Sequence, residues 1–323
     1  MVGIGHRSIK MAIGAGLAIW LATLFNLEYA TFAAIIVIIC IEDSKMKTLL
    51  TMREKFIASL LALILGALFL ELLGYHPITF ALFSLLFFPF LAKLRIQGGF
   101  LTSIVVLLHI YALEKANVAV FLNELYIILI GMGIALLVNS IMPNLQPKID
   151  AHKKHIESKF GTILYEYAAK LRDSTRTWDE KEMIEVEEVI EEAKSIAILD
   201  VENHLLRKKN KDYYYLEMRE EQLILLKQMR QFVTTAASSE APIQQKEMIA
   251  DYFNHLSENV DATDTTSESF DKLNNCMITL RNSKLPTTRE EFEVRANLFY
   301  LIFEIENYLK VKRKLFAKWT KSN

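Results

Sequence analysis

The sequence predicts an all-α membrane protein, in which a six-helix transmembrane bundle is followed by a cytosolic α-helical bundle domain. Three observations support this fold class. Six apolar runs fill the first half of the chain, positive charge falls on alternate loops between them, and the second half is charged with periodic apolar residues. Alternating β-branched runs bounded by turn residues, which are typical of strands, are absent from the sequence.

The six apolar runs are predicted to be the membrane-spanning helices. They cover residues 9–25, 28–41, 55–73, 77–92, 99–113 and 118–142. A helix needs roughly 20 apolar residues to cross the hydrocarbon core, and the first, third and sixth runs approach this length. The other three are short and require neighbouring helices to shield their ends, because backbone polar groups cannot stay unpaired in lipid.

The loop charges predict the orientation of these helices. Basic residues occur before the first run, in the second and fourth loops and after the sixth run, whereas the loops between contain almost none apart from Lys115. By the positive-inside rule both termini lie in the cytoplasm, and the protein is a multi-pass protein of a cell membrane. A re-entrant hairpin of the first two runs is a weaker interpretation, since the charges alternate without a break.

Composition changes sharply at Pro143 and Pro147. We therefore expect a transmembrane domain over 1–146 and a cytosolic α-helical domain over 147–323. Two capping-box patterns, Thr177 with Glu180 and Thr288 with Glu291, predict helix starts in the second domain.

Charge and cysteine content narrow the function classes. The formal net charge is −1, which gives no bulk attraction to nucleic acid. The two cysteines, Cys40 and Cys276, do not have metal-site spacing, and we expect neither a metal nor a cofactor. No phosphate-binding glycine loop or nucleophile elbow is visible, so an enzyme is not expected.

Small residues recur every four positions in three of the apolar runs. Such stripes let helices approach closely in lipid, and they serve either packing within one bundle or a dimer interface or pore wall. The residues concerned are Ala12 and Gly16; Ala58, Ala62 and Gly66; and Gly131, Ala135 and Asn139.

Polar residues within membrane helices often mark a transport pathway. Thr102 and His109 share one face of the fifth run with Ser103 beside it, and basic residues precede that run and the third. We interpret this set as a cationic mouth that collects organic anions from the cytoplasm. Its members are Arg53, Arg95, Gln97, Thr102, Ser103 and His109. The alternative is that the bases are ordinary topology signals and that His109 is a hydrogen-bonded core residue.

Glu124 lies near the outer start of the sixth run. A partly buried glutamate there, acting alone or with His109, could couple protons to export. It could equally be a solvated charge that interacts with the helix dipole.

The sequence also resembles a known family. LGYHPITFALF, LRIQGGFLTSIVVLLHI and LNELYIILIGMGIALLVNSIMP resemble the membrane domain of bacterial aromatic acid exporters, in the fusaric acid resistance group, and the second half resembles the C-terminal domain of these exporters. The resemblance implies export of aromatic or related organic acids. Larger relatives carry two membrane halves, which implies a homodimer here. Glu42 and Asp43 depart from the expected uncharged pair and weaken the cationic mouth.

The sequence therefore predicts an integral membrane exporter of aromatic or other organic acid anions, with the lipid bilayer and a small organic anion as its partners. Plant malate channels have a similar layout, so an organic-anion channel is one alternative. A non-transporting membrane scaffold or sensor is the other. A shared cavity for Arg53, Gln97, Thr102 and His109 would favour transport, whereas separate helix contacts would favour the scaffold.

Overall fold

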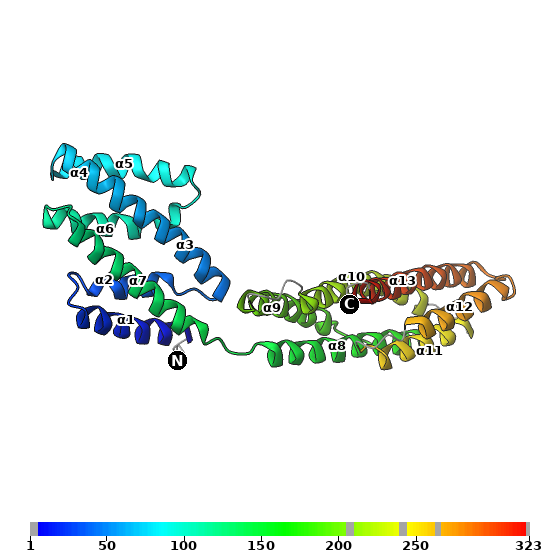
Figure 1. Ribbon diagram of the computed structural model, residues 1–323. Coiled ribbons are helices and arrows are strands. Elements are labelled where there is room, and N and C mark those ends of the chain that lie inside the picture. Colours follow the sequence, from blue (N-terminus) through cyan, green and yellow to red (C-terminus); the bar gives the residue numbers. More distant parts are fainter. Residues whose placement is uncertain (1–5, 205–209, 239–243, 262–265, 321–323) are drawn as a thin grey trace. The chain divides into compact units, whose positions relative to one another are not determined.

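A computed structural model describes residues 6–204, 210–238, 244–261 and 266–320, and these are helical with no strand among them. The predicted all-α class is therefore confirmed. The chain forms two compact units, which we describe separately (Figure 1). The first comprises Met1–Pro143 with Val201–Lys208, and the second comprises Asn144–Asp200 with Lys209–Asn323.

All six apolar runs are helical in the first unit. The helices are α1 (His6–Leu24), α2 (Thr31–Cys40), α3 (Lys45–Leu61), α4 (Ala67–Leu73), α5 (Pro77–Lys93), α6 (Phe100–Leu113) and α7 (Val118–Ser140). A π-helical turn, Ala62–Gly66, joins α3 to α4, and a 3-10 turn, Gln97–Gly99, precedes α6. Three stretches are long and apolar enough to cross a membrane, namely Arg7–Leu24, Lys45–Leu73 and Val118–Ser140.

The third apolar run starts earlier than the sequence predicts. Helix α3 begins at Lys45 because the Ser44 hydroxyl caps it, accepting a hydrogen bond from the Lys47 N–H at 3.2 Å. The polar first turns hide this start from a hydropathy pattern. With the π turn and α4, the helical stretch reaches 29 residues.

Helix α7 crosses the first unit and packs against α1, α2 and α3, while α3 packs against α6 (Figure 1). Small residues permit these contacts. A Cβ on Gly131 would lie 2.7 Å from Ile36 Cβ on α2, and a Cβ on Gly99 would lie 2.5 Å from Ala58 Cβ on α3. The backbones are thus as close as glycine and alanine allow.

The predicted stripes on the third and sixth runs lie in these interfaces. Their buried members are Ala58, Ala62 and Gly66 on one helix and Gly131, Ala135 and Asn139 on the other. Gly16 differs, because it is exposed and a Cβ there would meet nothing within 4 Å. Helix α1 instead turns Gly14, Ala18 and Ala22 inward, so packing within this unit does not use Gly16.

Helix α2 is held at both ends by asparagines of α7. Asn123 Oδ1 accepts from the Glu28 N–H at 2.8 Å while its Nδ2 donates to the Glu28 carbonyl, and Asn139 Nδ2 donates to the Glu42 carbonyl at 3.3 Å. The ten residues of α2 rise only about 15 Å, whereas the two asparagines are about 24 Å apart along α7. Side-chain amides therefore provide hydrogen-bond partners for the non-helical backbone groups at both ends of a short apolar helix.

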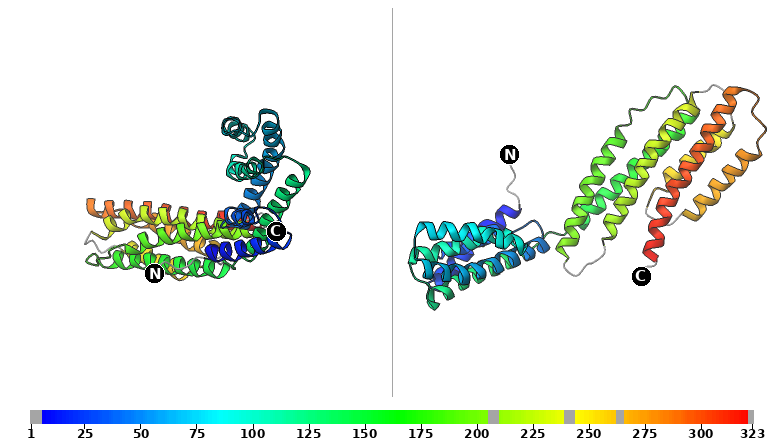
Figure 2. Two further views of the ribbon diagram at one scale, coloured as in Figure 1. Left: turned by 90° about the vertical axis from the view of Figure 1, so that its left-hand side faces the viewer. Right: turned by 90° about the horizontal axis from the view of Figure 1, so that it is seen from above.

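The second unit is a set of long helices. They are α8 (Gln146–Arg172), α9 (Lys181–Asn203), α10 (Lys211–Ala237), α11 (Gln244–Glu258), α12 (Thr266–Asn282) and α13 (Arg289–Thr320). Helix α10 packs against α13 and α8, and α8 packs against α11 (Figure 2). Their apolar faces form one continuous core that includes Phe160, Leu226, Phe253 and Leu301.

One of the two capping boxes forms. The Glu291 N–H donates to the Thr288 hydroxyl at 3.1 Å, and the Glu291 carboxylate accepts from the Thr287 N–H at 2.8 Å. The other does not form, because Glu180 has a positive φ of 60° just before α9 and its carboxylate pairs with Arg230. A long-range ion pair thus replaces the local cap.

Arg219 of α10 is fully buried within this core. Its guanidinium donates to the Val260 carbonyl at 2.5 Å, the Tyr215 hydroxyl at 2.9 Å and Gln222 Oε1 at 3.0 Å. Burial raises the pKa of Tyr308 to about 12, so this neighbouring phenol stays neutral. The charge is thereby paired and hydrogen-bonded, as a buried guanidinium requires.

Candidate functional site

A histidine and a glutamate meet inside the first unit. His109 Nδ1 of α6 lies 2.9 Å from Glu124 Oε2 of α7, and the Glu124 side chain is fully buried. His109 lies four residues before the end of α6, and Glu124 lies six residues after the start of α7. At 1.5 Å per residue, both are about 6–9 Å inside the helix ends.

Asn123 fixes the other carboxylate oxygen. Its Nδ2 donates to Glu124 Oε1 at 3.3 Å, and the same amide holds the backbone of Glu28 before α2. The carboxylate is therefore tied to α6 through His109 and to the α1–α2 turn through Asn123. A change in the charge of Glu124 would therefore alter the contacts of α7 with α6 and with the turn before α2.

Two aromatic rings border the imidazole. The Tyr29 ring stacks on His109 with centroids 4.2 Å apart and planes 4° from parallel, and the Phe32 ring lies edge-on at 5.0 Å. Tyr29 belongs to the turn before α2 and has a left-handed backbone, with φ of 57°. Aromatic walls of this kind lower the local dielectric constant and strengthen the interaction between the histidine and the carboxylate.

Such a pair is costly within an apolar unit. An ionised side chain near a bilayer centre costs about 2.5–3.5 kcal/mol on insertion scales, so membrane proteins retain it mainly for function. Carrying zero, one or two exchangeable protons, the pair has a net charge of −1, 0 or +1.

A second polar cluster surrounds Asn139 near the other end of α7. Asn139 Nδ2 donates to the Thr48 hydroxyl at 2.6 Å, and Lys10 Nζ donates to Asn139 Oδ1 at 3.3 Å. The Glu42 N–H also donates to the Thr48 hydroxyl, at 3.1 Å. These bonds join α1, α3 and α7 to the loop after α2, which is a packing role.

The residues predicted to form a cationic mouth differ in their exposure. Arg53, Arg95 and Gln97 are exposed, whereas Thr102 and Ser103 are buried between helices. The Ser103 hydroxyl donates to the Gly99 carbonyl at 2.6 Å, a bond within its own helix, and no partner for the buried Thr102 hydroxyl is found.

The start of α6 is also less open than its glycines indicate. A Cβ on Gly98 would lie 2.6 Å from Glu54 Oε2, so a carboxylate of α3 already lies against this turn. Glu42 and Asp43, which the sequence analysis expected to weaken the mouth, lie 3.6 Å and 3.2 Å from Arg7. Arg7 thus compensates one of these two negative charges.

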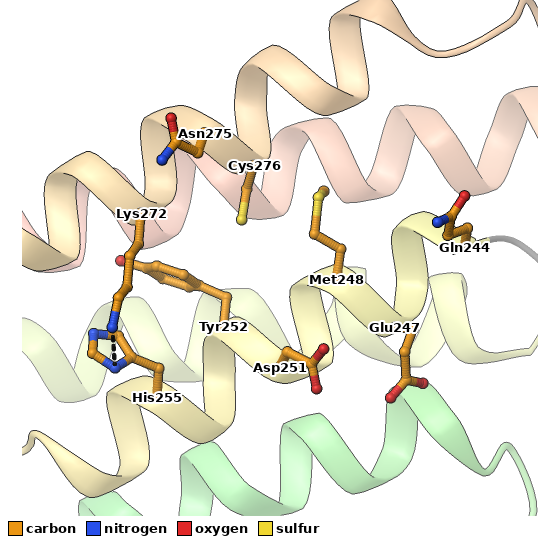
Figure 3. Close-up of a pocket in the computed structure, with 9 residues that line it drawn as sticks. All are labelled: Gln244, Glu247, Met248, Asp251, Tyr252, His255, Lys272, Asn275 and Cys276. Carbon is orange, nitrogen blue, oxygen red and sulfur yellow. Dashed lines mark hydrogen bonds between the residues drawn. The ribbon is translucent and has the colours of Figure 1, made fainter.

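A cavity of about 440 Å³ lies between α11 and α12 of the second unit (Figure 3). Met248, Tyr252 and Cys276 line its middle, and Lys272 Nζ lies 3.3 Å from His255 Nδ1 at one side. Burial, together with the nearby Lys272 charge, lowers the pKa of His255, and burial raises that of Cys276. A thiol of raised pKa is a weak nucleophile, so Cys276 is poorly suited to nucleophilic chemistry.

Comparison with known proteins identifies the family. Residues 2–142 match the family model "Aromatic acid exporter family member 1", and residues 146–313 match "Putative aromatic acid exporter C-terminal domain". The chain belongs to the aromatic acid exporter family. Membership in this exporter family indicates a membrane transporter rather than an enzyme.

Two individual proteins extend the comparison. "Uncharacterized protein YqjA" of Bacillus subtilis (strain 168) is 37% identical over 312 residues, which cover 97% of this chain and 96% of that protein. The structure titled "Crystal structure of putative membrane protein from Clostridium difficile 630" has a TM-score of 0.44 at 16% identity, covering 52% of this chain and 99% of that one.

The sequence analysis selected His109 and Glu124 separately, and the structure brings them together. It did not identify Tyr29, Phe32 or Asn123 as their neighbours. Asn123 and Glu124 are adjacent in the sequence near the start of the sixth run, and this adjacency could have indicated their contact. The aromatic neighbours come from a turn about 80 residues earlier, and no local pattern links them to His109.

Proposed function

We propose that this protein exports aromatic or other organic acid anions across the bacterial plasma membrane and exchanges them for protons at His109 and Glu124. In this proposal six segments cross the bilayer, both termini are cytoplasmic, and two copies form the working dimer. The second unit, on the cytoplasmic side, assembles or gates the membrane unit.

The observation that supports this proposal best is the 2.9 Å contact between His109 and the fully buried Glu124. A proton-exchanging group within an apolar unit is what a proton-coupled carrier needs. A scaffold would gain nothing from it, because a well-packed apolar pair is often as stable as a buried ionic one.

The charge balance makes exchange favourable. One anion moving outward and one proton moving inward each carry charge in the direction that an inside-negative potential favours. Each charge contributes about 2.3 kcal/mol per 100 mV, so a one-for-one exchange gains about 4.6 kcal/mol at that voltage.

The basic residues on the predicted inner side would collect the substrate in this scheme. Arg53 and Arg95 are exposed and can attract anions over a Debye length of about 8 Å at physiological ionic strength. Arg7 offsets one of the two negative charges of Glu42 and Asp43.

Efflux from proteoliposomes tests the proposal. Vesicles containing the full-length protein are loaded with radiolabelled benzoate or an aliphatic carboxylate, and efflux is followed with and without an imposed pH gradient. We expect protein-dependent efflux that the gradient accelerates. Glu124→Gln and His109→Gln should each reduce this acceleration by about tenfold or more, equivalent to about 1.4 kcal/mol.

Glu114→Gln is the matched control, because Glu114 is an exposed carboxylate just after α6. It should leave efflux unchanged. If efflux does not depend on the pH gradient in the wild type or in Glu124→Gln, the protein is a channel rather than a proton-coupled carrier. Folded, correctly oriented protein with no efflux above empty vesicles would favour the scaffold or sensor.

A further inference from the structure

We propose that Tyr29, Phe32 and His109 form the binding slot for a planar aromatic carboxylate, in which the substrate carboxylate bonds to His109 Nε2 and its ring lies along Tyr29. This inference rests on the proposed export function and adds where, and by which chemistry, the substrate binds.

The two nitrogens of His109 have different surroundings. Nδ1 faces Glu124 at 2.9 Å, whereas Nε2 makes no hydrogen bond to any described residue and is not among the fully buried atoms without a partner. The His109 side chain retains 13% exposure. An imidazolium that gives one N–H to Glu124 therefore has its second N–H available for a ligand carboxylate, as a charge-assisted hydrogen bond.

The planes of the rings favour a flat ligand. Tyr29 lies parallel to the imidazole within 4°, with centroids 4.2 Å apart. A carboxylate that accepts from Nε2 lies near the imidazole plane, so a ring conjugated to it would run parallel to the Tyr29 ring, beside the area that the imidazole covers. A saturated ring is not flat and would lose this contact.

Phe32 and Asn123 complete the slot from two further directions. Phe32 stands perpendicular to the imidazole, with centroids 5.0 Å apart, and adds a second aromatic wall. Asn123 holds Glu124 on one side and the Glu28 backbone on the other, so it fixes the turn that carries Tyr29. The amide of Asn123 thus positions both Glu124, which contacts His109, and the turn that carries Tyr29.

The backbone of Tyr29 supports a functional role for this position. Tyr29 has a left-handed φ of 57°, an uncommon conformation for a residue other than glycine or asparagine. It also remains 37% exposed although it stacks on His109. Strained residues cluster at ligand sites, where the surrounding structure holds them in place.

Binding to full-length protein in nanodiscs tests the slot. Radiolabelled benzoate is bound at equilibrium and displaced by unlabelled benzoate or by cyclohexanecarboxylate, which has the same carboxylate on a saturated ring. We expect the wild type to prefer benzoate by about threefold to tenfold, the usual range for one aromatic contact. Tyr29→Leu should bring this ratio close to one, and Tyr29→Phe should retain it.

His109→Gln provides the second arm. It removes the charged N–H and should weaken both acids equally, so that the ratio of their affinities stays at the wild-type value. Phe88→Leu is the control, because Phe88 lies edge-on to Phe100 away from the slot and should change nothing.

An unchanged ratio in Tyr29→Leu would overturn the slot, as would a wild type that binds neither acid or binds both equally. Efflux of benzoate by the wild type, measured in parallel, separates the two proposals. Efflux with an unaltered ratio in Tyr29→Leu rejects the slot alone, whereas absence of efflux and of binding rejects the export function as well.

Discussion

Each unit of the molecule buries one charged side chain completely, and the two are held in different ways. Arg219 in the second unit donates to a backbone carbonyl, a phenol and an amide, and its guanidinium also lies 3.4 Å from the carboxylate of Glu157. Glu124 in the membrane unit has a histidine at 2.9 Å and an amide at 3.3 Å. The partners of Arg219 fix its charge, whereas a partner of Glu124 can change charge with it.

This contrast separates a structural charge from an exchangeable one. Arginine stays protonated at any physiological pH, and its planar fork suits several fixed acceptors. Histidine is the side chain that titrates near neutrality. A fixed network suits a rigid helical domain, and a titratable pair suits a site that must load and unload.

The largest effect on stability is expected for Arg219→Leu. It leaves Gln222, the Val260 carbonyl and Tyr215 without their donor in a closed core, and breaking a buried charge network costs about 3–5 kcal/mol. Hydrogen exchange of the full-length protein should show faster exchange throughout α8, α10 and α13. Arg289→Leu, at an exposed position, is the control, and equal protection in both variants would contradict the network's importance.

A smaller effect is expected for Gly131→Ala. The added Cβ would lie 2.7 Å from Ile36 Cβ and 2.9 Å from the Ala33 carbonyl, so α2 and α7 must separate at a cost of about 1–3 kcal/mol. Thermal unfolding of the purified protein in detergent measures this. Gly133→Ala, where nothing lies within 4 Å, should be neutral, and a loss as large as that for Gly131→Ala would refute close packing as the cause.

Asn139→Leu should destabilise the membrane unit by about 1–2 kcal/mol, because the Glu42 carbonyl and the Thr48 hydroxyl lose an amide partner. Interhelical hydrogen bonds in membranes average less than this, so backbone exposure at the end of α2 must add to the loss. Hydrogen exchange around Glu42 should rise selectively. Asn144→Leu is the control, because the wild-type Asn144 side chain accepts a hydrogen bond from the nearby Gln146 N–H. It tests whether the loss of any asparagine destabilises the protein as much as the loss of Asn139.

The smallest effect concerns pH and the second unit. The folded pKa of His255 lies below its ordinary 6.5 because of burial and Lys272, with Glu268 and Glu258 opposing. At pH values between the folded and the unfolded pKa of His255, the unfolded chain binds more protons than the folded chain. The free energy of unfolding therefore rises with pH in this range and falls as the pH drops below about 6.5. Denaturant unfolding from pH 7.5 to 5.5 should show this slope, and His255→Gln should flatten it. A slope of the opposite sign would mean that the two carboxylates dominate.

How far the sequence determines this fold can be judged from particular elements. The apolar runs predicted every helix of the membrane unit, because hydrophobic length and the need to pair backbone groups leave helix as the only choice. The start of α3 was misplaced by ten residues, since its first turns are polar and its cap is a single serine. Gly16 was assigned to packing although two faces of α1 carry small residues, and only the neighbouring helices select Gly14, Ala18 and Ala22.

The candidate site was predicted in part. His109 and Glu124 stand out because ionisable side chains are rare in apolar runs, and the sequence suffices to select them. The cationic residues were grouped by their position along the chain, yet Arg53 and Gln97 are exposed while Thr102 is buried. Sequence neighbours at the end of a helix need not share a face, and the crossing of α3 and α6 decides which of them turns inward.

By itself, then, the sequence determined the helical class, the family and the two ionisable residues of the candidate site, because these depend on composition and periodicity along one chain. Tertiary structure decided that His109 meets Glu124, that Tyr29 and Phe32 border the imidazole, and that asparagines of α7 hold the ends of α2. The physical reason is that these contacts join residues from different helices. Their distances follow from how closely glycine and alanine let those helices approach, which no single segment specifies.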